Sequence, residues 1–168
     1  MLVTINTDAS YYHDHKVGGY AFWAACNDWK LCKFGAIKDK CTCSTDAELK
    51  SIANAIFCTL QQSNNIHWLI INTDCLNAIH LFNDDVREIR KYDLLRYNKV
   101  MGRIKGIIKK YESKIGRKIK VHFRHVKAHS ATDTARSWVN DWCDQKAKEG
   151  ARKKILQITS GTGFLRTA

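Results

Sequence analysis

The sequence predicts an α/β fold, a five-stranded mixed sheet flanked by helices. Three strand-like segments separated by turn residues come first, and helical and strand-like segments then alternate along the chain. With 168 residues the chain is long enough to bury a core as one domain. We therefore expect one α/β domain over residues 1–150 and a basic, flexible tail over residues 151–168.

Apolar patterning defines the three N-terminal strands. In residues 2–9 the apolar side chains alternate with polar ones, as they do in a strand with one buried face. Apolar runs over residues 17–26 and 29–37 follow, and an Asn-Asp turn joins them. This arrangement predicts an antiparallel hairpin or meander.

The middle of the chain predicts a helix, a buried strand and a second helix. Residues 46–62 have apolar side chains at helical spacing, and Thr45 is a suitable N-cap. Residues 66–73 form a continuous apolar run of strand length, which is typical of a central buried strand. Asp74 ends that run, and a short helix over residues 75–82 follows it.

The C-terminal part predicts two further helices and one strand. Residues 86–115 carry a helical apolar stripe that loses its phase near residues 91–93, where we expect a break. Residues 118–126 alternate as a strand does. A last helix is expected over residues 134–149, because Gly150 is a natural C-terminal stop. The buried side of that helix is expected to consist of Trp138, Val139 and Trp142.

The chain is strongly basic. It has 28 Lys and Arg against 16 Asp and Glu, which gives a net charge of +12. Residues 86–120 hold thirteen of the basic residues and three acids, an imbalance too large for paired salt bridges. The excess favours a phosphate-rich partner. Charge alone is also compatible with a basic protein that binds no nucleic acid.

Four carboxylates are the candidate chemical groups, and each also has a simpler interpretation. Asp8 could be a turn residue, and Glu48 could complete a capping box with Thr45. Asp74 follows a strand that should be central, where α/β sheets place ligands, but it could equally cap the next helix. Asp144 could be a solvated helical acid.

Taken together, the four carboxylates indicate a metal site. Two divalent cations about 4 Å apart can activate a water and stabilise the leaving oxygen of a phosphodiester. Holding them requires several carboxylates from separate elements, and Mg²⁺ prefers oxygen ligands. In a basic protein this combination indicates metal-dependent cleavage of nucleic acid. His129, in the loop before the last helix, could relay protons, although a solvent-exposed loop histidine is the simpler interpretation.

The pattern resembles ribonuclease H of type 1. The matching motifs, in the family's order, are TDAS with Asp8, DAEL with Glu48, NTD with Asp74, VKAH with His129, and NDWCDQKA with Asp144. They span nearly the whole of residues 2–150, and the segment around the last two motifs is similar to versions found in phages and mobile elements. The resemblance implies a ribonuclease H-like fold and hydrolysis of the RNA strand of RNA–DNA hybrids at internal positions. It also implies a two-metal-ion mechanism that leaves 5′-phosphate and 3′-hydroxyl ends.

The resemblance also implies residue roles. Asp8 would bridge two Mg²⁺ ions, for which Mn²⁺ is a possible substitute, and Asp144 would share the ion that binds the attacking water. Glu48 and Asp74 would hold the second ion, with Glu48 near the ribose 2′-OH that distinguishes RNA from DNA. His129 would assist proton movement or product release. The expected substrate-binding residues are Ser10, Ser44, Asn140, Arg87, Arg90, Lys91, Arg96 and Lys127.

Two features of the sequence depart from the family pattern. Polar or basic residues usually precede the helix glutamate and bind a phosphate of the DNA strand, whereas this chain has Cys43, Ser44, Thr45 and Asp46 there. We expect Asp46 to repel a phosphate. Many members also carry a basic, aromatic protrusion after the third carboxylate, but all five tryptophans lie outside residues 81–120.

The remaining expectations concern compartment and partners. Seven cysteines, an odd number, indicate free thiols in a reducing, cytoplasmic compartment. Cys41 and Cys43 lack the second ligand pair that a structural zinc site needs. We expect a monomer that binds an RNA–DNA hybrid, no membrane and no small-molecule cofactor beyond the metal. The alternatives are a non-catalytic nucleic-acid-binding module, a related nuclease acting on DNA, and a domain cut from a reverse transcriptase polyprotein.

Overall fold

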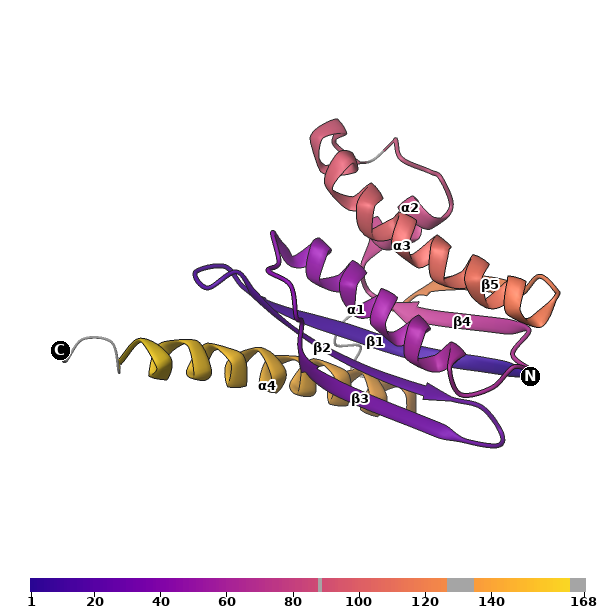
Figure 1. Ribbon diagram of the computed structural model, residues 1–168, viewed down its shortest axis with the longest axis horizontal. Helices are drawn as coiled ribbons and strands as arrows, with labels where there is room; N and C mark the ends of the chain where they lie inside the picture. The colour runs from indigo at the N-terminus through magenta and orange to yellow at the C-terminus, as the bar shows by residue number, and fades with distance from the viewer. Residues whose placement is uncertain (88, 127–134, 164–168) are drawn as a thin grey trace.

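The computed structural model of the chain shows a mixed five-stranded sheet with helices on both faces (Figure 1). It describes residues 1–87, 89–126 and 135–163. The strands are β1 (Leu2–Tyr12), β2 (Val17–Ala25), β3 (Lys30–Ala36), β4 (Trp68–Thr73) and β5 (Lys120–His125). The helices are α1 (Ser44–Leu60), α2 (Leu76–Phe82), α3 (Lys91–Ile115) and α4 (Ala135–Gly163).

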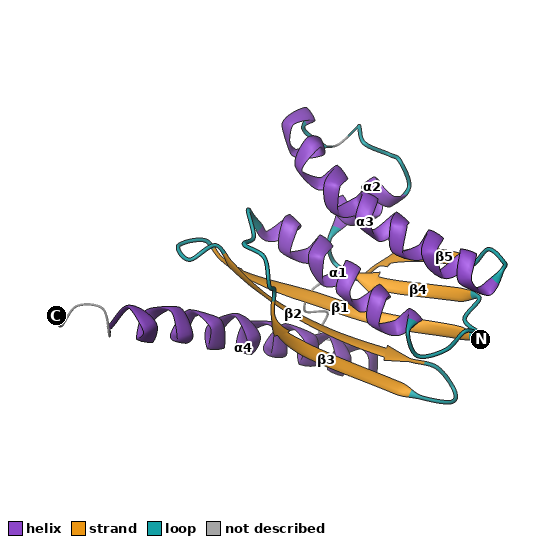
Figure 2. Cartoon of the chain, viewed as in Figure 1, coloured by secondary structure: helices purple, strands orange, loops and turns teal. Residues whose placement is uncertain are grey.

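The sheet has the order β3-β2-β1-β4-β5. β1, β2 and β3 form an antiparallel meander, as their turn residues predict, while β4 and β5 run parallel to β1. The predicted α/β class, strand number and mixed sheet are therefore confirmed. Figure 2 shows these strands and helices in the same view, coloured by type.

Alternation along the strands separates two faces of the sheet. Val3 and Ile5 are fully buried on the face covered by α1, and the hydroxyl of Thr7 lies 2.8 Å from that of Ser51 in α1. The apolar stripe of α3 packs beside α1 over the same core. α4 packs on the opposite face, mainly against β1, β2 and β3. On β4, Leu69 and Ile71 are fully buried, whereas Trp68 is exposed and Ile70 half-buried, so its apolar run is fully buried on one face only.

The expected stop at Gly150 is wrong, because α4 continues without interruption to Gly163. Gly150 lies where α4 crosses β3, and a Cβ there would come within 2.3 Å of the Gly35 carbonyl oxygen. Gly19 makes a similar close approach, since its Cβ would meet the Ala147 carbonyl oxygen at 1.9 Å. These glycines let α4 lie directly against β2 and β3. The domain boundary at residue 150 stays a prediction, whereas residues 151–163 are helical rather than irregular.

The expected buried side of α4 also needs correction. Trp138 is 57% exposed, and the fully buried positions of α4 are instead the small residues Cys143, Ala147 and Ala151. Small side chains are required there because the helix backbone approaches the sheet so closely. Trp142 is only half-buried, and its ring packs edge-on against Trp23.

The other differences are at element boundaries. α1 begins at Ser44 with Cys43 as its N-cap, so the expected N-cap at Thr45 is wrong. The predicted loss of phase near residues 91–93 corresponds to the start of α3 at Lys91. None of the helices in the described part of the chain has the length and apolar character needed to cross a bilayer.

Candidate active site

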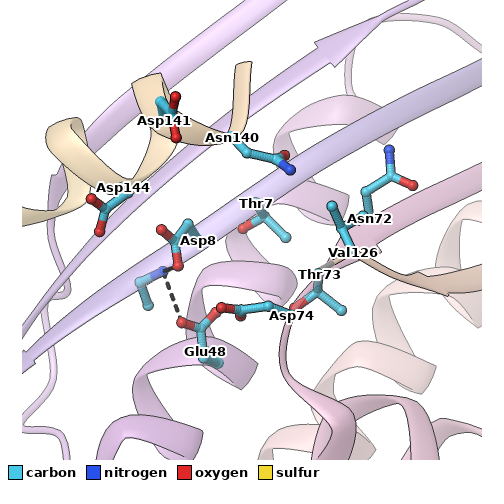
Figure 3. Close-up of a pocket in the computed structure, with 11 residues that line it drawn as sticks. Thr7, Asp8, Glu48, Asn72, Thr73, Asp74, Val126, Asn140, Asp141 and Asp144 are labelled. Atoms are coloured by element: carbon cyan, nitrogen blue, oxygen red, sulfur yellow. Dashed lines mark hydrogen bonds between the residues drawn. The ribbon is translucent and has the colours of Figure 1, made fainter. Parts of the chain in front are cut away.

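Three carboxylates from separate elements meet beside the central strands (Figure 3). Asp8 lies on β1, Glu48 lies near the start of α1, and Asp74 directly follows β4. The parallel register that pairs Asn6 with Asn72 places Asp8 and Asp74 side by side, two residues further along. One oxygen from each of the three carboxylates lies within 4.8 Å of the others. They are the sole group of metal-ligating side chains of this kind within the described ranges.

The first turn of α1 presents Glu48 to the site instead of capping the helix. The backbone N–H of Ala9 donates to Asp8 Oδ1 at 2.8 Å and to Glu48 Oε1 at 3.0 Å. The side chain of Cys43, the N-cap, makes no capping hydrogen bond. The capping-box interpretation of Glu48 is therefore wrong, and the shared amide fixes Asp8 and Glu48 relative to each other.

The local environment disfavours negative charge on the carboxylates of Asp8 and Glu48. Burial, reinforced by the neighbouring Asp74 charge, raises the pKa of Asp8 to about 6. Burial and the charges of Asp8 and Asp74 also raise the pKa of Glu48 well above its usual range. The second carboxylate oxygen of Glu48, Oε2, is buried without a hydrogen-bond partner among the described residues.

These residues fit a hard divalent cation. A buried carboxylate oxygen without a donor is costly, and so is the mutual repulsion of three acids. A cation held by their oxygens offsets both costs, and oxygen ligands are those that Mg²⁺ and Mn²⁺ prefer. The donor set contains no sulfur or nitrogen, which disfavours zinc.

Asp144 lines the same pocket but stands outside the cluster of three. Its Oδ2 accepts a hydrogen bond from Lys148 Nζ at 2.7 Å, one turn further along α4. The pocket has a volume of about 210 Å³. Its lining consists of Thr7, Asp8, Ala9, Glu48, Asn72, Thr73, Asp74, Val126, Asn140, Asp141 and Asp144.

Removing the Lys148 ammonium should strengthen divalent-cation binding. Lys148 competes with any cation for Asp144, so we expect Lys148→Met to lower the dissociation constant for Mg²⁺ about two- to fivefold, as suits a partly exposed ion pair. Isothermal titration with Mg²⁺ measures this directly. Lys153→Met, which removes an ammonium paired with Glu149 on the same helix, is the matched control. Unchanged or weaker Mg²⁺ binding by Lys148→Met would show that the pair does not compete.

The expected substrate-binding residues lie at different distances from the cluster. Asn140 lines the main pocket, and Ser44 lines an adjoining hollow together with Glu48 and Asp74. Ser10 lies two residues beyond Asp8 on β1, opposite Gly19, and is not a lining residue of the main pocket. His129 and Lys127 lie outside the described residues.

The basic candidates lie on α3 and just before it, away from the main pocket. Arg87 forms an ion pair with Asp85, and Arg90 with Asp93, both at 3.0 Å. Arg90 also lines a hollow that includes Ser44. Exposed side chains of Lys91 and Arg96 lie in the first two turns of α3.

The expected repulsion by Asp46 is not supported. Asp46 is buried, and its Oδ2 accepts hydrogen bonds from Lys50 Nζ and from the Thr42 backbone N–H, both at 2.9 Å. Its charge is therefore compensated within the protein. Of the four residues from Cys43 to Asp46, the first three line the hollow beside α1 and Asp46 does not.

Among the residues at the site that were missed at the level of sequence, Asn72 and Lys148 make side-chain contacts there. Asn72 lines the pocket, and its Nδ2 donates to Asn6 Oδ1 at 2.8 Å. The two-residue period of a strand, counted back from Asp74, would have placed Asn72 on the side of the site. Lys148 was readable as the residue four positions after Asp144 on a helix.

The fold and the pocket define an α/β protein with a carboxylate site beside the central strands of a mixed sheet. The chain belongs to the RNase H family, whose sequence pattern it matches over residues 2–152. It is thus a member of a nuclease family, and the resemblance seen in its motifs is confirmed. No match was found among curated proteins.

Solved structures of RNase H domains share the fold. The N-terminal RNase H domain of Rv2228c from Mycobacterium tuberculosis, solved as a fusion with maltose-binding protein, superimposes with a TM-score of 0.67 at 12% identity. That match covers 94% of this chain and 98% of the other. LC11-RNase H1 in complex with an RNA/DNA hybrid gives a TM-score of 0.66 at 13% identity, covering 91% and 99%. A structure of LC11-RNase H1 isolated from compost gives 0.63 at 11% identity, covering 91% and 97%.

Proposed function

We propose that this protein cleaves the RNA strand of RNA–DNA hybrids at internal positions. The observation that carries the proposal is the convergence of Asp8, Glu48 and Asp74 within 4.8 Å in a chain of the RNase H family. Support comes from the net charge of +12, which suits a polyanionic substrate. The similar LC11-RNase H1 was solved with an RNA/DNA hybrid bound.

The carboxylates would hold two divalent cations, Mg²⁺ or Mn²⁺. Asp8, between Glu48 and Asp74 on one side and Asp144 on the other, would contact both. When bound, such a pair supplies activation of water and charge stabilisation at the leaving oxygen. Glu48 and Asp74 would complete one ion site, and Asp144 would complete the other after releasing Lys148.

The residues of the chain itself orient the substrate and the ligands. The Ala9 amide holds Asp8 and Glu48 in one geometry, so these two carboxylates would need little rearrangement for catalysis. Asn140 at the pocket wall would position the scissile region, and Ser44 in the adjoining hollow would contact the neighbouring backbone. Basic side chains of α3 would bind phosphates of the hybrid. His129, whose imidazole is of a type suited to proton transfer, would move a proton at the leaving oxygen.

The chemistry of the product ends tests the proposed reaction. Hydrolysis with an attacking water leaves 5′-phosphate and 3′-hydroxyl ends, whereas attack by the 2′-OH leaves a 2′,3′-cyclic phosphate. We expect the RNA fragments to be joined by a ligase that requires 5′-phosphate, without prior kinase treatment. Fragments that need phosphorylation first would contradict metal-assisted hydrolysis by this site.

Acidic pH should weaken metal-dependent activity. Because the pKa of Asp8 is raised to about 6, protons compete with cations for this ligand below that pH. We expect the half-saturating Mg²⁺ concentration to rise roughly tenfold per pH unit below pH 6, as for one displaced proton, and to level off above pH 7. Cleavage rates titrated with Mg²⁺ from pH 5 to pH 8 measure this. The same half-saturating concentration at pH 5 and pH 7 would contradict it.

A further inference from the structure

One part of the sheet is left uncovered by the helices. Side chains that alternate with the core residues of β1, β4 and β5 point to the opposite face of the sheet, which is the face that α4 covers. α4 packs mainly against β1, β2 and β3, and in Figure 1 it runs beneath those strands, away from β4 and β5. In the described part of the chain, α4 therefore packs closely on β1, β2 and β3 but not on the half of this face formed by β4 and β5.

The strand register arranges this face in three rows. The rows consist of Leu2, Trp68 and Lys120, then Thr4, Ile70 and His122, then Asn6, Asn72 and Arg124. The third row borders the active site, because Asn72 lines the acidic pocket. The rows thus extend from the carboxylates to the far end of the sheet. From Asn6 to Leu2 along β1 this is about 13 Å, at about 3.3 Å per residue.

The exposed groups on this face are aromatic, aliphatic and cationic. Trp68 is 38% exposed and Leu2 is 40% exposed, so large apolar surface remains in contact with solvent. Lys120 Nζ lies over the Trp68 ring at 5.6 Å from its centroid. Lys120 and Arg124 form no ion pair with a carboxylate of the described residues, and the three rows contain no acid.

We propose that this uncovered face of β1, β4 and β5 binds a single-stranded nucleic-acid flank of the substrate. An aromatic ring with aliphatic neighbours on an open sheet suits unpaired bases, and unpaired cations alongside suit the phosphates that connect them. A duplex would leave Trp68 without a base to stack on. Because the rows are continuous with the acidic pocket, a nucleic-acid strand that extends out of the site would lie along this face. This inference rests on the proposed function for its substrate.

Binding measurements on flanked and blunt hybrids test the proposal. The divalent cation is chelated so that no strand is cut, and fluorescence anisotropy compares a blunt RNA–DNA hybrid with hybrids that carry a DNA or an RNA overhang. We expect an overhang of one of these kinds to tighten binding roughly five- to tenfold. Raising the salt should reduce this gain with an additional log–log slope of about 1.4, as two phosphate contacts of a single strand give.

Variants assign the gain to the proposed face. Trp68→Ala and, separately, Lys120→Gln should each remove most of the overhang gain while leaving the affinity for the blunt hybrid unchanged. Lys120→Gln changes an exposed side chain and keeps the test valid if Trp68→Ala misfolds. The matched controls are Phe57→Ala, an exposed aromatic of α1, and Lys118→Gln, whose ammonium is already paired with Glu112.

The outcomes separate this inference from the proposed function. If blunt hybrid is bound and later cut with Mg²⁺ but overhangs give no gain, the face does not bind a single strand and the function stands. If the overhang gain persists in both variants, or if Trp68→Ala instead changes the oligomeric state, the inference is overturned. If a single strand alone is bound through Trp68 but no hybrid is ever cut, the face is established and the proposed function fails.

Discussion

Asp74→Asn should reduce the single-turnover rate of hybrid cleavage by more than about 100-fold. Loss of a residue that only supports a metal ligand lowers metal affinity or activity by up to about 100-fold, and loss of a ligand itself should cost more. Asp74 follows β4 beside Asp8, and its carboxylate completes the group of three. The amide has the same size but no charge, so it binds a hard cation weakly. The substitution therefore removes a proposed cation ligand with little change in packing.

A matched control distinguishes a local effect from a general one. Asp28→Asn makes the same chemical change at the turn between β2 and β3, which follows Ala25, the partner of Thr4 rather than of Asp8, and it should leave the rate unchanged. Circular dichroism and thermal unfolding should show that Asp74→Asn remains folded. If folded Asp74→Asn cleaves at a rate close to that of the unaltered protein, the carboxylate group is not the catalytic centre.

Asp8→Asn should make the metal-free protein more stable at neutral pH. The folded-state pKa of Asp8 is raised from 3.8 to about 6. Its contribution to stability is therefore fully present below pH 3.8 and is lost as the pH rises through about 6. At pH 7 the ionised carboxylate costs about 3 kcal/mol, at 1.36 kcal/mol per pKa unit. Removing this charge should raise Tm in a chelator by roughly 5–10 °C for a chain of this size.

Two comparisons test the origin of that stabilisation. At pH 4 the difference in Tm between Asp8→Asn and the unaltered protein should nearly vanish, because Asp8 is then protonated in the folded state. Added Mg²⁺ should raise the Tm of the unaltered protein at pH 7 and leave that of Asp8→Asn almost unchanged. A lower Tm for Asp8→Asn in chelator at pH 7 would mean that the carboxylate is stabilised by partners other than a metal ion.

The sequence predicted the sheet well because strand patterns depend on local alternation and on burial. The continuous apolar run before Asp74 predicted a buried strand, and it became β4, an interior strand between β1 and β5 whose Leu69 and Ile71 are fully buried. The end of α4 could not be predicted in the same way. Gly150 has the local character of a stop, but its close approach to Gly35 on another strand requires a glycine within the helix.

For the site, residue types and order were readable, while side-chain partners were not. Asp8, Glu48 and Asp74 were identified from their motifs, and the structure brings them together. Glu48 was ambiguous because a capping box uses the same residue at the same spacing. The competing partner, the Ala9 amide, lies 39 residues away in the sequence and becomes available only through the packing of α1 on β1. The helical i,i+4 spacing made Lys148 a candidate partner of Asp144, but whether the two side chains pair depends on rotamers that a sequence does not specify.

Cleavage of an end-labelled RNA strand, presented as an RNA–DNA hybrid, as double-stranded RNA and as a single strand, tests the central claim most directly. Each substrate is incubated with Mg²⁺, with Mn²⁺ and with a chelator. We expect internal cuts in the hybrid alone, with either metal, and none in the chelator. A protein that binds the hybrid but never cuts it with Mg²⁺ or Mn²⁺, or that cuts all three substrates equally, would contradict a metal-dependent, hybrid-specific nuclease.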